Sequence, residues 1–214
     1  MAIRKQLLDK YKELPQMERY EILDKIKQLK SLRNQALVCF LYLTGCRVEE
    51  VVKFIKEKNP HRIVKRDDQW VKAPIENRSL IGLPIQKKQI EIEDDNLTIR
   101  NVRCLKRKTM VRRSIPILFK DKEMSFINIL QSYLNGLQED DYLFPITRTR
   151  AYQILSKIGL FPHYLRHIRM THLVVDYNFS SGHLKKFTGW SDSKTADDYV
   201  HLSVDDLLDK MRSV

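Results

Sequence analysis

Cysteines are few in this sequence and have no paired spacing. The three, Cys39, Cys46 and Cys104, form no CxxC motif, and the sequence has no signal-peptide pattern. An odd number without paired spacing does not make a disulfide framework, so we expect a reducing, cytoplasmic setting. The longest apolar run, residues 36–43, is far shorter than the ~20 residues that a membrane-spanning helix needs. We therefore expect no membrane segment, and internal repeats and low-complexity tracts are absent as well.

Metal-binding motifs are also lacking. His163, His167 and His172 are the candidates, and the first two have the i,i+4 spacing found in some zinc sites. No HExxH pattern accompanies them, and no cysteine lies nearby in the sequence. We therefore expect no metal and no other cofactor. His167 and His172 are expected to be core residues or to orient neighbouring arginines.

Positive charge is what the sequence has in excess. Its 39 Lys and Arg residues outnumber 27 Asp and Glu residues, which gives a formal net charge of +12. Such an excess attracts a polyanion at long range. Such an excess fits an RNA-binding or ribosome-associated protein as well as a DNA-binding one. The motifs are therefore needed to distinguish between these classes of protein. With 214 residues, 43% of them hydrophobic, the chain can bury one core, and we expect a single domain, 1–214.

Arg166 stands near the predicted start of a helix. Proline is favoured at the first helical position, so a helix is expected to begin near Pro162. His163 and Arg166 then lie three residues apart on one face of the first turn. Backbone amides and the helix dipole favour a phosphate at this end. The alternative is a surface helix that happens to be basic.

Arg47 has a similar setting. Residues 34–43 are almost wholly apolar, Thr44 and Gly45 can end that helix, and Arg47 precedes an amphipathic helical stretch over 48–55. Glu50, one turn further on, can accept hydrogen bonds and hold a neighbouring arginine in place. The alternative is an ordinary surface ion pair contributing about 0.2–0.5 kcal/mol.

Two arginines of this kind suit one class of chemistry. A phosphodiester repels an incoming oxygen, so cleavage without a metal requires cationic donors aimed at its non-bridging oxygens. The guanidinium fork does this with two charge-assisted hydrogen bonds. The hydroxyl of Tyr199 could then attack phosphorus, hold the phosphoryl group as a covalent ester and return it to another hydroxyl without ATP.

A basic segment lies between two predicted strands. Residues 97–105 alternate apolar and polar side chains, and residues 114–117 form the expected partner strand. The segment between them, 106–113, reads KRKTMVRR. It is a candidate source of a catalytic lysine. Alternatively, it is a solvated tip that grips the DNA backbone without chemistry.

Four short motifs together resemble the tyrosine recombinase (phage integrase) family. Residues 41–50, LYLTGCRVEE, are similar to the family's first box, LLYxTGLRxxEL, and residues 163–172, HYLRHIRMTH, to its second, HxLRHTFATH. Residues 188–190 correspond to the LGH box and 199–201 to the nucleophile box. Their order and spacing also match those of the family. The resemblance implies an α+β, mostly α-helical catalytic-domain fold with a small antiparallel sheet that includes a β-hairpin.

The resemblance implies a role for each matching residue. Arg47 and Arg166 would clamp the scissile phosphate, and Tyr199 would attack it to leave a 3′-phosphotyrosyl link and a free 5′-hydroxyl. His163 would hydrogen-bond the phosphate and assist proton transfer.

Two further positions follow from the resemblance less directly. Trp190 stands where most members have histidine, and an indole N–H can donate a hydrogen bond but cannot shuttle a proton. Its alternative role is that of a core residue. Aligning residues 115–117 with the family's VPL sequence makes Lys108 the general acid that protonates the departing 5′-oxygen, with Lys106 as the second candidate.

The resemblance also implies partners. We expect double-stranded DNA, and self-association on DNA as a synaptic tetramer, in site-specific recombination or integration by a mobile element such as a virus or plasmid. A type IB topoisomerase and a non-catalytic DNA-binding accessory protein are the alternatives. The chain has no room for the N-terminal domain of ~100 residues found in many members, so it is either a minimal recombinase or a catalytic fragment.

The sequence also predicts secondary structure outside the four motifs. Helices are expected within residues 1–30 and over 124–137 and 147–158. The segment 59–95 is longer than usual for the family and is expected to hold extra strands or a loop that crosses the DNA. The C-terminal tail, 203–214, has helical spacing and would dock on a neighbouring subunit or on its own core.

Overall fold

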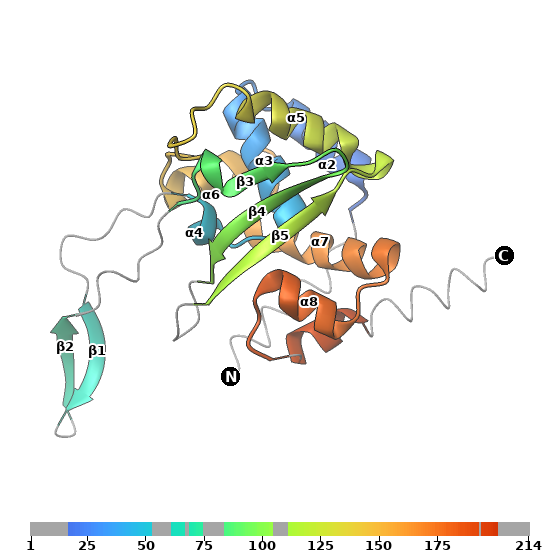
Figure 1. Cartoon of the computed structure of the whole chain (residues 1–214). Coiled ribbons are helices and arrows are strands. Elements are labelled where there is room, and N and C mark those ends of the chain that lie inside the picture. Colours follow the sequence, from blue (N-terminus) through green and yellow to red (C-terminus); the bar gives the residue numbers. More distant parts are fainter. Residues whose placement is uncertain are drawn as a thin grey trace.

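The computed structural model of this chain describes most of its length. Helices and short antiparallel strands make up these parts, and helices predominate (Figure 1). The α+β fold class predicted from the sequence is confirmed. The described residues are 17–52, 61–66, 69–74, 84–104, 111–192 and 194–200.

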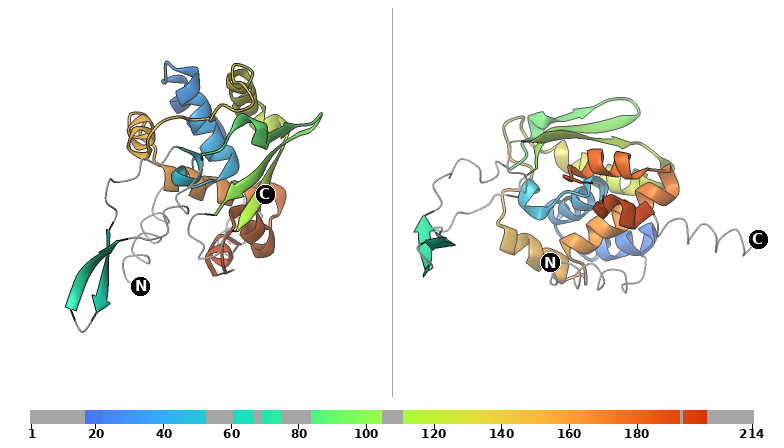
Figure 2. Two further views of the ribbon diagram at one scale, coloured as in Figure 1. Left: turned by 60° about the vertical axis from the view of Figure 1, so that its left-hand side comes forward. Right: turned by 90° about the horizontal axis from the view of Figure 1, so that it is seen from below.

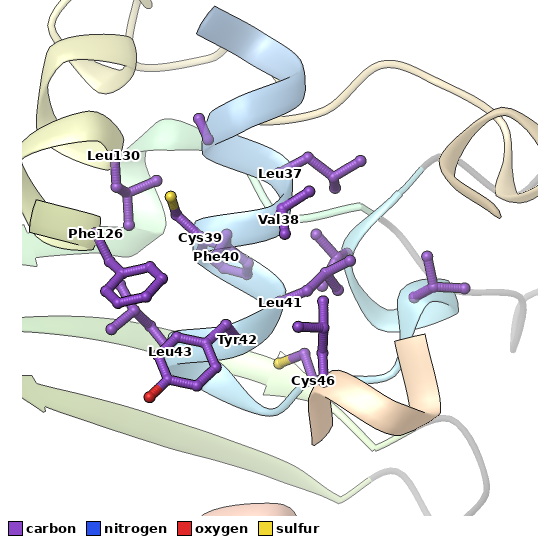
Figure 3. Close-up of a cluster of buried hydrophobic side chains, with 14 of the residues drawn as sticks. Leu37, Val38, Cys39, Phe40, Leu41, Tyr42, Leu43, Cys46, Phe126 and Leu130 are labelled. Carbon is purple, nitrogen blue, oxygen red and sulfur yellow. The ribbon is translucent and has the colours of Figure 1, made fainter. Parts of the chain in front are cut away.

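A buried helix made from the apolar run lies at the centre of the core. Helix α3, Leu32–Thr44, is buried over its last nine residues. Gly45 ends it in the left-handed conformation at φ 56°, which glycine adopts without a Cβ penalty. Figure 3 shows side chains of this helix facing those of a neighbouring helix. The rings of Tyr42 and Phe126, for example, have centroids 4.6 Å apart.

Several helices pack against α3, and the local sequence explains some of their ends. Pro162 is the first residue of its helix, as predicted, and Asn178 ends the same helix in the left-handed conformation. Thr147 caps another by accepting a hydrogen bond from the backbone N–H of Arg150 at 3.1 Å. No helix in the described segments is both long and apolar enough to cross a bilayer. The helices that pack against α3 are α2 (Arg19–Lys27), α5 (Met124–Leu134), α6 (Arg148–Ser156) and α7 (Pro162–Tyr177). Helix α4 (Val48–Val51) packs against α6, and α8 (Ser181–Thr188) packs against the sheet.

A three-stranded antiparallel sheet covers one side of α3 (Figures 1 and 2). Side chains of its last strand alternate between exposed and buried, and α8 packs beside that strand. A bulge interrupts the pairing between Ile99 and Val102, where Asn101 has a φ of 57°. The strands, in their order across the sheet, are β3 (Ile90–Ile92), β4 (Asn96–Arg103) and β5 (Arg112–Leu118). Short 3-10 helices, η2 (Lys87–Gln89) and η3 (Asp121–Glu123), flank the sheet.

A separate hairpin is inserted between α4 and the sheet. Strands β1, His61–Arg66, and β2, Gln69–Pro74, pair antiparallel in continuous register. Together with β3 they confirm the extra strands expected within residues 59–95. The hairpin stands apart from the three-stranded sheet in both figures of the whole chain.

Most predicted elements are found with small shifts of their ends. The strands expected at 97–105 and 114–117 are β4 and β5, and the helices expected at 124–137 and 147–158 are α5 and α6. The helical stretch expected over 48–55 is shorter: α4 ends at Val51, because Val52 is extended and forms a parallel bridge with Phe144. Residues 53–55, the first 16 residues and the tail 203–214 lie outside the described segments.

Candidate active site

Arg47 precedes helix α4 at the end of the turn that follows α3. Its backbone N–H donates a hydrogen bond to Glu50 Oε2 at 3.0 Å, and its Nη1 lies 3.3 Å from Oε1 of the same carboxylate. The Arg47 side chain remains 16% exposed, whereas that of Glu50 is fully buried. One carboxylate therefore fixes both the start of the helix and the arginine side chain.

Arg166 is buried in the first turns of α7. Its Nη1 donates to the carbonyl of Gly45, and its Cζ lies 5.4 Å from the centroid of the Trp190 ring, within cation–π range. Its Nη2 is buried and has no hydrogen-bond partner in the described segments. Among the buried arginines of the described segments, Arg113 pairs with Glu50 and Arg169 pairs with Glu123, although each leaves one N–H without a hydrogen bond. Arg166 is the buried arginine of these segments that has no carboxylate as a direct partner.

Arg113, on strand β5, is a third arginine of the site, and the sequence motifs did not indicate it. Its Nη2 donates to Glu50 Oε2 at 3.0 Å and lies 3.5 Å from Cys46 Sγ, while its Nη1 lies 3.2 Å from Cys104 Sγ. The signal that could have found it is the strand period, since Arg113 shares the inward face with Ile115 two residues later.

The charges of this site are unequal. We call Arg47, Glu50, Arg113 and Arg166 the arginine-rich cluster, in which three guanidinium groups surround one carboxylate. Burial alone would raise the pKa of Glu50, but the three positive charges outweigh burial and lower it. Burial, followed by repulsion from Arg47, lowers the pKa of Arg166 to about 10. The cluster therefore has an excess of positive charge that an anion would compensate.

Tyr199 is connected to this cluster through the ring of Trp190. It belongs to a helical segment, residues 194–200, and only 8% of its surface is exposed. Its ring stacks on Trp190 at a centroid distance of 5.7 Å, and its hydroxyl lies 3.3 Å from His167 Nδ1. Trp190 thus contacts both Arg166 and Tyr199, so two distant motifs meet at one indole ring. The contact between His167 and Tyr199 was not predicted from the sequence.

His163 and Lys108 are the other two predicted site residues. His163 is exposed on the first turn of α7, one helical turn before Arg166. Lys108 and the alternative Lys106 lie in residues 105–110, outside the described segments. Strands β4 and β5 flank that segment, and at this end the Cys104 N–H donates a hydrogen bond to the Val111 carbonyl at 3.0 Å.

A second group of charges, buried or partly buried, lies further along α7. We call Arg19, Glu123, Arg169 and Asp176 the balanced cluster, because two guanidinium groups meet two carboxylates. The exposed Lys122 also pairs with Asp176, at 2.8 Å. Arg169 donates to Glu123, and Arg19 donates to Asp176 at 2.7 Å. Burial alone would lower the pKa of Arg169, but the charge and hydrogen bond of Glu123 together with Tyr42 and Tyr177 raise it.

His172 lies next to the balanced cluster. Its Nδ1 is 2.8 Å from the Tyr42 hydroxyl. Burial, and then the charge of Arg19, lowers the pKa of His172 to about 4. The residue is therefore neutral in the core at physiological pH. The described segments contain no group of three or more His, Cys, Asp or Glu side chains placed to bind a metal ion.

Solved structures share this fold. The site-specific recombinase XerH, bound to palindromic difH DNA in a post-cleavage complex, matches with a TM-score of 0.59 and 17% identity over 92% of this chain and 52% of that protein. XerA recombinase matches with a TM-score of 0.52 and 16% identity, over 93% and 65% of the two chains. The Tn1549 transposon integrase, in complex with a circular intermediate DNA, has a TM-score of 0.52 at 12% identity, over 87% and 62%. The fold is that of a tyrosine recombinase catalytic domain.

Sequence comparison points the same way. The tyrosine recombinase XerA of Saccharolobus solfataricus is 29% identical over 131 residues, which are 58% of this chain and 41% of that protein. This similarity agrees with the resemblance to the tyrosine recombinase family that the four motifs predicted. It spans about two fifths of the length of this curated relative. No protein-family profile matches the sequence.

Proposed function

We propose that this chain cleaves and rejoins double-stranded DNA in site-specific recombination, through a covalent bond between Tyr199 and a 3′-phosphate. One observation carries the proposal: Arg166 is buried without a carboxylate partner in the described segments, in a cluster with excess positive charge. The indole of Trp190 contacts both this arginine and Tyr199. A DNA phosphate would supply the missing negative charge beside a phenolic nucleophile.

The cleavage step uses the residues in defined roles. Arg166 and Arg47 donate hydrogen bonds to the non-bridging oxygens and stabilise the charge that develops on them. The Tyr199 oxygen attacks phosphorus, a new O–P bond forms, and the bond from phosphorus to the 5′-oxygen breaks. The phenolic proton passes to a nearby base, for which His167 and His163 are candidates.

The departing 5′-oxygen leaves as a hydroxyl. Lys108, or alternatively Lys106, gives it a proton, and rejoining reverses each step with a 5′-hydroxyl as the attacking group. Trp190 packs against its neighbours and can donate one hydrogen bond through its indole N–H. It transfers no proton, because an indole does not shuttle protons. Bond energy is retained in the phosphotyrosyl ester, so the cycle requires no ATP.

Replacing the nucleophile tests the proposal directly. Tyr199→Phe removes the attacking oxygen and keeps the ring that stacks on Trp190. We expect it to abolish the covalent adduct on nicked suicide DNA while non-covalent binding stays within a few-fold of wild type. The measurement is a denaturing gel of protein–DNA adducts, beside a mobility-shift titration at fixed salt.

A matched control is Tyr20→Phe, because Tyr20 is 65% exposed on helix α2. It should form the adduct at the wild-type rate. An adduct that persists in Tyr199→Phe would assign the nucleophile to another residue. Wild-type protein that binds DNA without any adduct would favour the accessory, non-catalytic alternative.

The same chemistry also serves type IB topoisomerases. Relaxation of supercoiled plasmid without strand exchange between two sites would favour that alternative. We propose recombination because the solved structures with the same fold include recombinases and a transposon integrase on DNA. The DNA partner, assembly as a tetramer on DNA and an intracellular setting are parts of this proposal. Size-exclusion chromatography of the protein with and without DNA tests the assembly.

A further inference from the structure

Arg113 is buried in the site, but neither the motifs nor the proposed cleavage step gives it a role. Its side chain is 5% exposed, on the inward face of β5. A solvated basic strand end would not require such burial. Arg112, the preceding residue, is exposed on the same strand and shows the ordinary position for an arginine there.

The guanidinium of Arg113 joins segments that are far apart in sequence. Its Nη2 donates to Glu50, the carboxylate that also accepts from both the backbone and the side chain of Arg47. Its Nη1 is 3.2 Å from Cys104 Sγ, and Cys104 directly precedes residues 105–110, the sequence segment that contains Lys106 and Lys108. One side chain is therefore connected to the carboxylate that holds Arg47 and to the residue that precedes the lysine-containing segment.

A third segment packs against the same group. Gly189, which precedes Trp190, has a φ of 69°. A Cβ at this position would lie 2.4 Å from Cys104 Sγ and 3.0 Å from Arg113 Nη1. Glycine is required here both for the backbone conformation and for this close approach. The turn that carries the indole therefore rests on Arg113 and Cys104.

We propose that Arg113 is a positioning residue of the reaction, which fixes Arg47, the base of the lysine-bearing hairpin and the turn before Trp190 relative to one another. The inference rests on the proposed function. Arg113 does not touch DNA in this role. It acts through Glu50 and Cys104, and its planar fork is needed because the two contacts lie in different directions.

The test compares Arg113→Lys and Arg113→Gln with Arg100→Gln, a change at an exposed arginine of the neighbouring strand β4. Groups that orient other site residues typically contribute 10–100-fold, so we expect both Arg113 variants to cleave about 10–100-fold more slowly than wild type. DNA affinity and the thermal midpoint of Arg113→Lys should stay close to wild type. Arg100→Gln should retain the cleavage rate, because it removes only an exposed ion pair with Glu91.

A second substrate separates positioning from general destabilisation. DNA with sulfur in place of the bridging 5′-oxygen has a leaving group that departs without protonation, because a thiol is far more acidic than an alcohol. If Arg113 holds the lysine-bearing hairpin in place, this substrate should recover most of the rate that Arg113→Lys loses. A structural defect would slow both substrates equally.

The outcomes are distinct. If wild-type protein forms no adduct on either substrate, the proposed function fails. If wild type cleaves and Arg113→Lys matches Arg100→Gln, the positioning role is overturned and the proposed function stands. An Arg113→Lys protein that does not fold also overturns the inference. An Arg113→Lys protein that folds but is not rescued by the sulfur substrate overturns the part of the inference that concerns the lysine-bearing hairpin.

Discussion

The two clusters are both built from arginines and carboxylates that are buried or partly buried, and they differ in charge balance. In the balanced cluster, Arg19 and Arg169 meet Glu123 and Asp176. In the arginine-rich cluster, three guanidinium groups surround Glu50 alone. A buried charge that contacts an opposite charge holds elements together, whereas a buried charge without such a contact is unfavourable until an anion arrives.

The pKa values of two neighbouring arginines express this difference. Arg166 and Arg169 lie three residues apart on α7, and both are buried. Burial lowers the pKa of both arginines, but Glu123 and the neighbouring tyrosines together raise that of Arg169, whereas burial and Arg47 lower that of Arg166 to about 10. Burial therefore does not decide the role of an arginine. What differs is the direct partner, because Arg169 donates to a carboxylate and Arg166 donates to a backbone carbonyl.

The largest expected effect is on the balanced cluster. Arg169→Ala leaves Glu123 buried without its closest partner, so the free energy of unfolding should fall by about 3–5 kcal/mol. Urea unfolding followed by circular dichroism measures this loss. If the free energy of unfolding of Arg169→Ala stays within about 0.5 kcal/mol of wild type, the range of ordinary surface changes, the cluster does not hold the fold and the comparison fails.

The matching change in the arginine-rich cluster should act on rate instead. Arg166→Ala removes a transition-state donor, and cleavage should slow about 10²–10³-fold, or roughly 3–4 kcal/mol. Its stability should change much less than that of Arg169→Ala, because the lost charge has no carboxylate partner in the described segments. Single-turnover adduct formation and binding titrations give the two numbers. Equal losses in binding and rate would indicate simple phosphate gripping.

The motifs indicated candidate residues of the site but not their connections. Arg47, Arg166 and Tyr199 could be proposed from the sequence because each stands in a local pattern of known chemistry. The pairing of Arg113 with Glu50 spans 63 residues, and that of Arg169 with Glu123 spans 46. Such contacts depend on how β5 and η3 pack against helices, which hydrophobic periodicity does not specify. The sequence therefore could not tell which arginine of α7 would have a carboxylate.

A smaller effect concerns pH and His172. Its pKa is about 4 in the fold and near 6.5 when unfolded, so the unfolded chain binds the extra proton between these values. Stability should therefore fall as the pH drops from about 6.5 to about 4, by roughly 3 kcal/mol at most. Thermal unfolding across this range measures the loss. His172→Gln should flatten that part of the profile, and an unchanged slope would assign the acid sensitivity to other groups.

The smallest effect tests the missing anion without DNA. Sulfate that binds the arginine-rich cluster at about five times its Kd should raise the free energy of unfolding by about 1 kcal/mol. Sulfate also stabilises proteins by exclusion from their surface, so the informative quantity is the difference between wild type and Arg166→Ala at equal sulfate. Sodium chloride at the same ionic strength controls for screening. We expect the extra stabilisation in wild type and not in the variant. Equal stabilisation of both would mean that the excess charge of this cluster does not select an anion, and the contrast between the two clusters would lose its functional meaning.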